Sequence, residues 1–316
     1  MKAIGLYRFG GPDVLQVVDL PTRVPPVGAV LVRVAAAAVN PTDLTYRRGG
    51  RAAQLERRAR PLIPGFDFAG RVEAIPAGSS SALRVGDPVV GLASPLGEWS
   101  GAYAAFVVAD ERSVVAAPAG VSLSNASTLL LNALTARVAI ERLGLNGGAS
   151  VLITGAAGAV GGYAVQVAHE RGLRVVALAS AQDSDVLRAW GADYVIARGP
   201  AAIAGVLELF PAGVDGVVDA ADLQGGVVPA IKAGGSIASL KGWSGDIPGI
   251  SVVPISATVE ATNTAILEEL VQAAARRKIA LRVSMRLPYT GAADAHRLLE
   301  EGGVRGRIVL EFPPGD

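Results

Sequence analysis

The segment that decides the fold is residues 150–166, SVLITGAAGAVGGYAVQ. It begins with a short apolar run typical of a buried strand and ends in a sequence of helical character. Between them, Gly155, Gly158 and Gly161 have the spacing GxxGxxG, a relative of the dinucleotide fingerprint. Small residues let the backbone approach a pyrophosphate, whose charge the amide groups of the helix N-terminus then hold. The segment therefore predicts a coenzyme site, with a tight turn that only serves helix–strand packing as the alternative.

The sequence on either side divides into two kinds of unit. From about residue 122, strands alternate with amphipathic segments, which predicts a Rossmann-type, doubly wound parallel sheet with helices on both faces. Its expected strands are residues 150–154, 174–180, 194–197, 216–220 and 236–240, before a helix at 261–278. The first 120 residues instead hold short β-rich runs separated by turns, at 29–39, 68–75, 88–92, 103–108 and 114–116, with further β-like sequence at 281–287 and 307–312. We expect an α/β protein with a second, mostly β unit.

Composition excludes several classes of function. The 316 residues suffice for two domains. With 29 Lys and Arg against 28 Asp and Glu, the net charge of +1 disfavours nucleic acid as a partner. The absence of cysteine removes thiolate metal sites, and His169 and His296 are the only imidazoles, so we expect no metal.

Localisation is predicted from what the sequence lacks. No apolar run approaches the ~20 residues of a membrane-spanning helix. The N-terminal residues read as a strand and not as a signal peptide. We expect no membrane partner and a cytoplasmic location.

The identity of the dinucleotide depends on the end of the second strand, where NAD enzymes usually carry an acidic residue. Here that strand ends with the neutral Ser180, which can donate to a 2′-phosphate, and Arg198 follows the third strand as a planar cation suited to the same group. These residues favour NADPH over NADH. The alternatives are that Ser180 caps a loop and Arg198 is a surface charge, while Asp183 is close enough to reach a ribose and keeps NADH open.

Further motifs occur in an order that resembles one protein family. They are VNPTD at 39–43, PLIPGFDFAG at 61–70, VGDPVVG at 85–91, GAYA at 101–104, LTA at 134–136 and RGRIVL at 305–310. The ordered set covers essentially the whole chain. It resembles the zinc-independent, quinone oxidoreductase-like (zeta-crystallin-like) branch of the medium-chain dehydrogenase/reductases.

The resemblance implies a domain plan and a class of chemistry. It places a GroES-like catalytic domain at residues 1–120 and 281–316 and a Rossmann domain at 121–280, with a cleft where nicotinamide meets substrate. Zinc-dependent relatives carry Cys at the position of Asn40 and His-Glu at Phe66-Asp67, so the metal ligands are absent here. What remains is hydride delivery to an electron-poor acceptor, a quinone or the double bond of an α,β-unsaturated carbonyl compound.

The resemblance also places candidate residues. Asn40 is expected to face the substrate oxygen or the nicotinamide ribose through its amide, with a turn before Pro41 as the alternative. Asp43 matches a carboxylate near the cleft and can equally brace its loop. Tyr46 is the candidate proton donor, although relatives place Tyr or Lys one residue earlier, and water can serve instead. Expected coenzyme contacts are Thr135, Gly155, Ala156, Gly158, Ala159, Val160, Gly161, Ser180, Arg198 and Arg307.

An apolar substrate pocket with aromatic walls is implied in the same way. Its expected residues are Phe66, Trp99, Leu131, Asn132 and Trp243, with core packing as the competing interpretation of each aromatic. Asn132 interrupts an apolar run and is a candidate for recognising a polar substituent. The arginines from Arg47 to Arg60 are interpreted as a solvated loop, with attraction of an anionic substrate as the alternative. Both histidines are interpreted as structural or exposed.

Two other functions and an assembly remain open. One is a biosynthetic enoyl reductase or cyclase acting on a polyketide-like substrate, and the other a non-catalytic, NADPH-binding structural or RNA-binding relative. By analogy the chain forms a homodimer through a short apolar strand at residues 249–255, which otherwise is an ordinary sixth strand.

Overall fold

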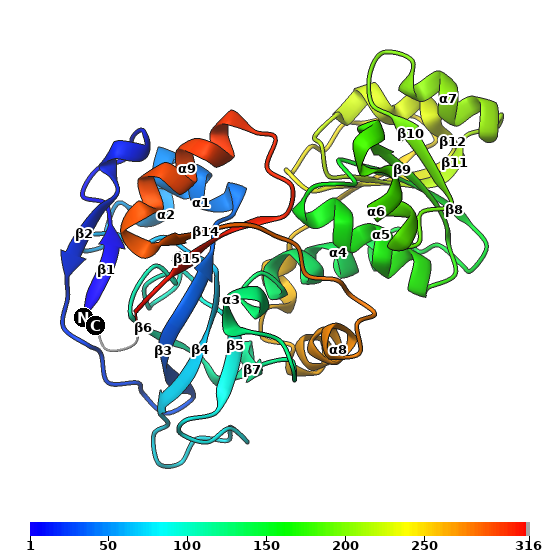
Figure 1. Cartoon of the computed structure of the whole chain (residues 1–316). Helices are drawn as coiled ribbons and strands as arrows, with labels where there is room; N and C mark the ends of the chain where they lie inside the picture. The colour runs from blue at the N-terminus through cyan, green and yellow to red at the C-terminus, as the bar shows by residue number, and fades with distance from the viewer. Residues whose placement is uncertain (314–316) are drawn as a thin grey trace. The chain divides into compact units, whose positions relative to one another are not determined.

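The computed structural model describes residues 1–313, which form two units (Figure 1). The first, here the β unit, comprises residues 1–131, 260–276 and the C-terminal segment from Leu281. The second, the α/β unit, comprises Asn132–Val259 and Arg277–Ala280.

The division by contacts differs from the expected boundaries at two places. Residues 121–131 lie with the β unit because helix α3 (Leu123–Ala126) packs on β3 (Ala29–Ala38) and β4 (Asp67–Ala74). Helix α8 (Thr264–Ala275) also belongs there. It packs against β7 (Val114–Ala116), and the Thr264 hydroxyl donates to the carbonyl of Arg112 at 2.9 Å.

The β unit is built on a seven-stranded sheet. Its order is β14-β15-β3-β4-β5-β7, and β6 (Phe106–Asp110) pairs with β3 off this path. The remaining members are β5 (Pro88–Leu92), β14 (Val283–Pro288) and β15 (Arg307–Glu311), while β1 (Lys2–Gly5) and β2 (Gln16–Asp19) form a separate pair. The strand predicted at 103–108 begins only at Phe106 because the amide of Tyr103 donates to Pro64 instead of joining the ladder.

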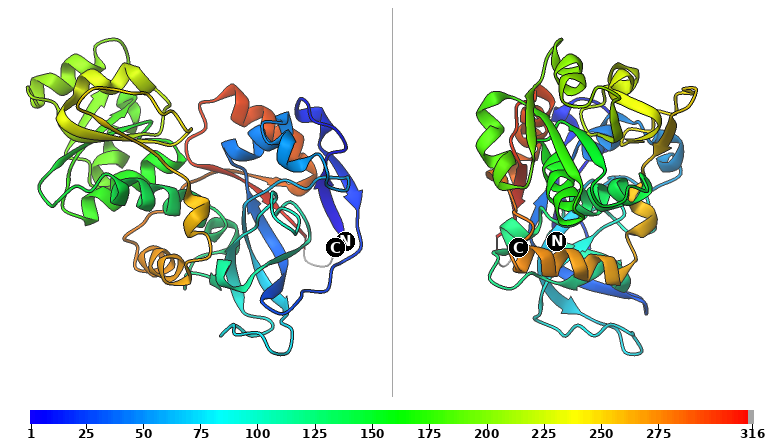
Figure 2. Two further views of the ribbon diagram at one scale, coloured as in Figure 1. Left: turned by 180° about the vertical axis from the view of Figure 1, so that it is seen from behind. Right: turned by 90° about the vertical axis from the view of Figure 1, so that its right-hand side faces the viewer.

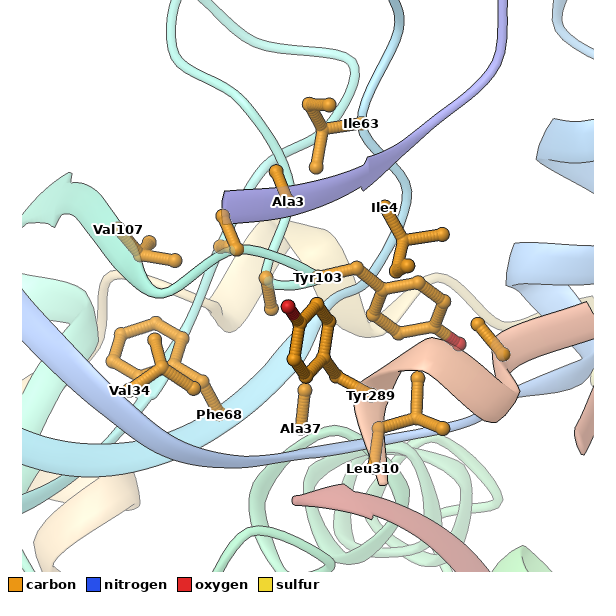
Figure 3. Close-up of a cluster of buried hydrophobic side chains, with 14 of the residues drawn as sticks. Ala3, Ile4, Val34, Ala37, Ile63, Phe68, Tyr103, Val107, Tyr289 and Leu310 are labelled. Atoms are coloured by element: carbon orange, nitrogen blue, oxygen red, sulfur yellow. The ribbon is translucent and has the colours of Figure 1, made fainter. Parts of the chain in front are cut away.

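The core of the β unit lies between this sheet and the segments that cover it. Ile4, Val34, Phe68 and Leu310, from four different strands, point toward one another with Tyr103 (Figure 3). Helices α1 (Pro41–Arg48), α2 (Ala52–Leu55) and α9 (Ala292–Glu301) complete the unit. Strands separated by more than 200 residues of sequence therefore share one core.

The α/β unit contains a parallel sheet, as predicted, in which the five expected strands are joined by β13 as the sixth, the alternative that we considered for residues 249–255. Its order is β10-β9-β8-β11-β12-β13, with helices on both sides (Figure 2). The strands are β8 (Ser150–Thr154), β9 (Arg174–Ala179), β10 (Tyr194–Ala197), β11 (Val214–Asp219), β12 (Ile231–Ser239) and β13 (Ser251–Pro254). The helices are α4 (Leu130–Arg142), α5 (Ala159–Glu170), α6 (Ser184–Ala189) and α7 (Ala202–Leu209). Strand β8 is buried along its whole length, whereas the turn that follows it is partly exposed.

Short 3-10 helices join these elements. They are η1 (Pro12–Val14), η2 (Glu111–Ser113), η3 (Ala181–Asp183), η4 (Gln224–Ala230), η5 (Ala257–Glu260) and η6 (Tyr289–Gly291). Among residues 1–313, the helices are all too short or too polar to cross a lipid bilayer.

Candidate active site

The glycine turn after β8 has the geometry that its sequence predicts. Gly155 has φ +57°, a left-handed conformation that favours glycine. A Cβ on Gly161 would lie 2.2 Å from the carbonyl oxygen of Gly155, so any larger residue would force the helix away from the turn. The structure thus explains two of the three glycines by local geometry.

The N-terminus of α5 is open to an anionic ligand. Gly158 is the N-cap residue and supplies no side chain to cap the helix. The first helical residues are Ala159 and Val160, whose amide groups point out of the helix end with the positive end of its dipole. This arrangement fits the pyrophosphate of a dinucleotide.

Ala156 departs from its expected role. It is fully buried, and its amide donates to the carbonyl of Leu178 in β9 at 3.2 Å. The amide is therefore engaged within the sheet, and Ala156 serves packing where we expected a coenzyme contact.

A buried carboxylate that the sequence analysis overlooked holds the neighbouring loop. Asp219, the last residue of β11, accepts hydrogen bonds from the Thr154 hydroxyl at 2.7 Å and from the amides of Leu223 and Gln224 at 3.0 and 2.8 Å. The amide of Ala221 in turn donates to the Thr154 hydroxyl at 2.9 Å. An acid at the end of a buried apolar strand was the signal available. Asp219 fixes the loop that packs against Gly155.

The end of β9 revises the predicted recognition of a 2′-phosphate. The Ser180 hydroxyl donates to the carboxylate of Asp183 at 2.8 Å, so its hydrogen is already engaged. Asp183 itself is buried. Arg198 is exposed, and its amide donates to the carbonyl of Ala179 at 2.9 Å. Arg198 therefore lies beside the end of β9 and is the better placed of the two predicted phosphate ligands.

In the β unit, Arg307 and Asp67 form a buried ion pair. Their side chains are 3% and 1% exposed, and Arg307 Nη2 lies 3.0 Å from Asp67 Oδ2. Arg307 Nη1 also donates to the carbonyl of Thr128 at 3.3 Å. The guanidinium that we expected to contact the coenzyme is thus held inside the β unit, where it neutralises a carboxylate.

Asn40 is tied to the same ion pair. Its Nδ2 donates to Asp67 Oδ2 at 2.9 Å and to the carbonyl of Ala38 at 3.3 Å. Both partners can only accept, which fixes the orientation of the amide. Its Oδ1 is buried and has no hydrogen-bond partner among the described residues. The atom of Asn40 left for a ligand is therefore an acceptor, whereas the sequence analysis expected a donor.

Asp43, the third residue of α1, is completely buried beside Asn40. Its carboxylate accepts from the amide of Asn40 at 2.8 Å, the amide of Gly65 at 3.0 Å and the hydroxyl of Tyr103 at 3.1 Å. Burial raises the pKa of Asp43 to about 7, although these three donors favour the ionised form. The bracing role that we considered for this residue is present in the structure.

Tyr46 offers little to a proton transfer. Its side chain is buried, and its hydroxyl lies 3.4 Å from the carbonyl of Pro95, to which it donates. Burial raises the pKa of Tyr46 to about 12. A phenol so placed holds its proton firmly, and its role as a donor stays a prediction that the geometry does not favour.

The predicted pocket residues differ in their surroundings. Trp99 packs against Ala29, Leu31 and Val108 of the β unit, and Trp243 packs against the core around β11 and η4 of the α/β unit. Phe66 and Leu131 are partly and fully buried without a feature that identifies a ligand, and the same holds for the partly buried Thr135, which we expected to contact the coenzyme. Asn132 is 4% exposed, and its Nδ2 lacks a partner among the described residues. Of the set, Asn132 has an unused donor.

Within residues 1–313, no cluster of three or more His, Asp or Glu side chains is placed to hold a metal ion. The buried groups around Asn40 are a carboxylate already paired with a guanidinium and a second carboxylate satisfied by three donors.

Comparison with known proteins agrees with this architecture. Residues 26–119 match the family described as alcohol dehydrogenase GroES-like domain, and residues 190–310 match that described as zinc-binding dehydrogenase. The 2-methylene-furan-3-one reductase of Solanum lycopersicum is 30% identical over 99% of this chain and 80% of its own length. A mycobacterial structure complexed with NADPH is 28% identical, covers 99% of this chain and all of its own, and has a TM-score of 0.85.

A third relative is similar over part of its length. The chloroplastic quinone-oxidoreductase homolog of Spinacia oleracea is 36% identical over 62% of this chain, and the match spans 60% of that protein. The two units and the names of these relatives define the class of the protein as an oxidoreductase. The chain belongs to the quinone oxidoreductase-like branch of the medium-chain dehydrogenase/reductases.

Proposed function

We propose that this oxidoreductase delivers hydride from NADPH to a quinone or to the activated double bond of an α,β-unsaturated carbonyl compound, without a metal. The observation that carries the proposal is the glycine turn of residues 155–161, whose closely packed backbone leaves the N-terminus of α5 open to a pyrophosphate. The names of the tomato and spinach relatives point to the same two classes of acceptor. Asn40 and Phe66 replace the metal ligands of zinc-dependent relatives, which supports metal-free chemistry.

When bound, NADPH supplies the hydride, and the residues of this chain bind the coenzyme and orient the substrate. The first turn of α5 holds the pyrophosphate, and Arg198 holds the 2′-phosphate as a planar cation. The free Oδ1 of Asn40 accepts from a hydroxyl group of the ribose or the substrate. Because Tyr46 and the amide hydrogens of Asn40 are engaged elsewhere, we propose water as the source of the proton.

Coenzyme selectivity tests the assignment of Arg198. Replacing Arg198 by Ala should raise the KM for NADPH about tenfold, because a charge-assisted hydrogen bond to the phosphate is lost. The KM for NADH should stay within twofold. Arg188→Ala removes another exposed arginine, on α6, and should change neither value. An unaltered NADPH preference in Arg198→Ala would leave this residue as a surface charge.

The proposed activity is tested by NADPH oxidation against a panel of quinones, α,β-unsaturated ketones and polyketide-like enoyl thioesters. Turnover with either class is the expected result. Calorimetric binding of NADPH with no turnover on any acceptor would favour a non-catalytic relative, and turnover confined to polyketide-like enoyl thioesters would favour a biosynthetic enoyl reductase. Failure of well-folded protein to bind NADPH or NADH would remove the proposal.

Asn40→Ala tests the acceptor assigned to the site. We expect kcat to fall about tenfold or more with little change in the dissociation constant of NADPH, since Asn40 is proposed to act in the chemical step whereas the first turn of α5 is proposed to hold the pyrophosphate. Stopped-flow turnover and calorimetry measure the two quantities separately. Equal kcat in a folded variant would take Asn40 out of the mechanism.

Four further assignments are proposals of the same kind. We propose that the β unit is the catalytic domain and the α/β unit the dinucleotide-binding domain, that a homodimer forms through β13 (Ser251–Pro254), the edge strand of its sheet, and that the location is cytoplasmic. The unused Nδ2 of Asn132 is proposed to donate to a polar group of the substrate. Light scattering tests the dimer directly.

A further inference from the structure

His296 lies in the interior of the β unit and links two charged regions. It is on α9, is fully buried, and places Nε2 3.2 Å from the hydroxyl of Tyr103. Its Nδ1 lies 3.5 Å from Arg47 Nη1, and the rings of His296 and Tyr103 meet edge to face. Arg47 is itself buried and paired with Glu300, which corrects the prediction of a solvated loop at this residue.

The side chains of Arg47, His296, Tyr103 and Asp43 form a series of hydrogen bonds. The donor and the acceptor of each bond follow from the chemistry of the groups. A guanidinium only donates, so Nδ1 of His296 must accept and Nε2 must carry the hydrogen. Nε2–H then donates to the Tyr103 oxygen, and the Tyr103 hydroxyl donates to Asp43 Oδ2 at 3.1 Å. The series runs in one direction, from Arg47 to Asp43.

This direction excludes one obvious role. A proton could pass to Asp43 only if His296 were reprotonated at Nδ1, and its partner there is a guanidinium, which keeps its protons. The series therefore cannot relay protons from the surface. Its hydrogen bonds instead fix the positions of the His296, Tyr103 and Asp43 side chains.

We propose that His296 and Tyr103 are positioning residues for the reaction, holding the Asp43 carboxylate and through it the two segments that carry Asn40 and Asp67. This inference rests on the proposed function. Asp43 connects the segments directly, because it accepts from the amides of Asn40 and of Gly65. Gly65 is also held by the Tyr103 ring, since a Cβ on Gly65 would lie 2.5 Å from that ring.

The charges around the series support the same assignment. Burial, with Arg47 and Arg48 nearby, lowers the pKa of His296 to about 3, so the ring is neutral near pH 7 as the hydrogen bonds require. Glu300 faces the two arginines from the same helix. The hydrogen bond from Tyr103 lowers the pKa of Asp43, and so does the positive charge of Arg307. The negative charge of Asp67 raises the pKa of Asp43.

The first test is Tyr103→Phe, which removes one hydroxyl from the series. Loss of this donor should raise the pKa of Asp43, so the pH at which kcat reaches half its plateau should move up by about one unit. The KM for NADPH should stay within twofold. Tyr289→Phe removes the hydroxyl of another buried tyrosine in the same core and should leave the pH profile unchanged. An unshifted profile in folded Tyr103→Phe protein overturns the proposal.

The second test replaces His296. Glutamine can accept from Arg47 and donate to Tyr103, so His296→Gln should keep most of kcat, whereas His296→Leu should lose about tenfold. Equal loss in both variants would mean that only the volume of the ring matters, which would overturn the assignment.

A third measurement does not depend on turnover. The chain contains two histidines, so in His169→Gln protein the imidazole nitrogen signals in a ¹H–¹⁵N spectrum belong to His296 alone. We expect a neutral ring with hydrogen on Nε2 from pH 5 to pH 8. Hydrogen on Nδ1, or a cationic ring, overturns the arrangement even if the proposed activity holds. If no acceptor is turned over, ¹³C titration of Asp43 in Tyr103→Phe protein still tests the predicted shift.

Discussion

Gly161→Ala protein is expected to lose NADPH binding by about 100-fold or more, and turnover with it. The added methyl group would lie 2.2 Å from the carbonyl oxygen of Gly155 and 2.7 Å from its carbonyl carbon, both main-chain atoms that cannot rotate away. The turn and the start of α5 must then separate, and the amides that hold the pyrophosphate leave their positions. Calorimetry with NADPH measures the loss.

A control variant separates this effect from the general cost of adding a methyl group. Gly225 lies in η4 of the same unit, and a Cβ there would meet nothing within 4 Å. Gly225→Ala should bind NADPH as the unsubstituted protein does. If Gly161→Ala binds NADPH normally while remaining folded, the turn after β8 is not the coenzyme site.

Arg307→Met should destabilise the β unit by about 3–5 kcal/mol, because the substitution leaves the Asp67 carboxylate buried without its counter-ion. Asp67 would keep two donors, the amide of Leu131 at 2.8 Å and the side chain of Asn40. Urea unfolding followed by Trp99 fluorescence, with Trp190 and Trp243 replaced by Phe, reports on the β unit alone.

Two further variants test whether the loss of stability comes from the unpaired charge of Asp67. Adding Asp67→Asn to Arg307→Met removes the stranded charge and should recover at least about 1 kcal/mol of the loss. Arg112→Met breaks an exposed ion pair with Asp110 in the same unit and should cost less than about 1 kcal/mol. If Arg307→Met were no worse than Arg112→Met, the buried pair would contribute little to the unit.

Local sequence patterns predicted the elements that local forces decide. The strand 150–154 and the glycine turn after it were placed correctly, because a continuous apolar run and the spacing of the glycines can both be read within a few residues. The parallel order of the central sheet followed from alternating strands and helices. The prediction of a strand was wrong for residues 103–105, because the backbone amide of Tyr103 donates to Pro64 in a loop.

Partners distant in sequence were not predictable in this way. Arg47 looked solvated because it belongs to an arginine-rich run, yet it is buried against His296, 249 residues further along the chain. Arg307 looked like a coenzyme ligand because it lies in a family motif, and it instead neutralises Asp67. Asn40 was expected to donate to the substrate oxygen or the ribose, but its Nδ2 is bonded to Asp67, a partner 27 residues away, and its Oδ1 is left without one among the described residues. Tertiary packing decides such questions, and a single sequence does not record it.

The discontinuity of the β unit bears on how the protein is made. Asp67 leaves the ribosome some 240 residues before the arginine that neutralises it, and β15 pairs with β3 only after nearly the whole polypeptide has been synthesised. The α/β unit is almost contiguous in the chain, so it can fold during translation. The N-terminal strands of the β unit cannot yet complete their sheet at that stage, and Asp67 is still hydrated. A nascent chain that stalls before residue 307 thus exposes an incomplete sheet edge, a natural target for chaperones.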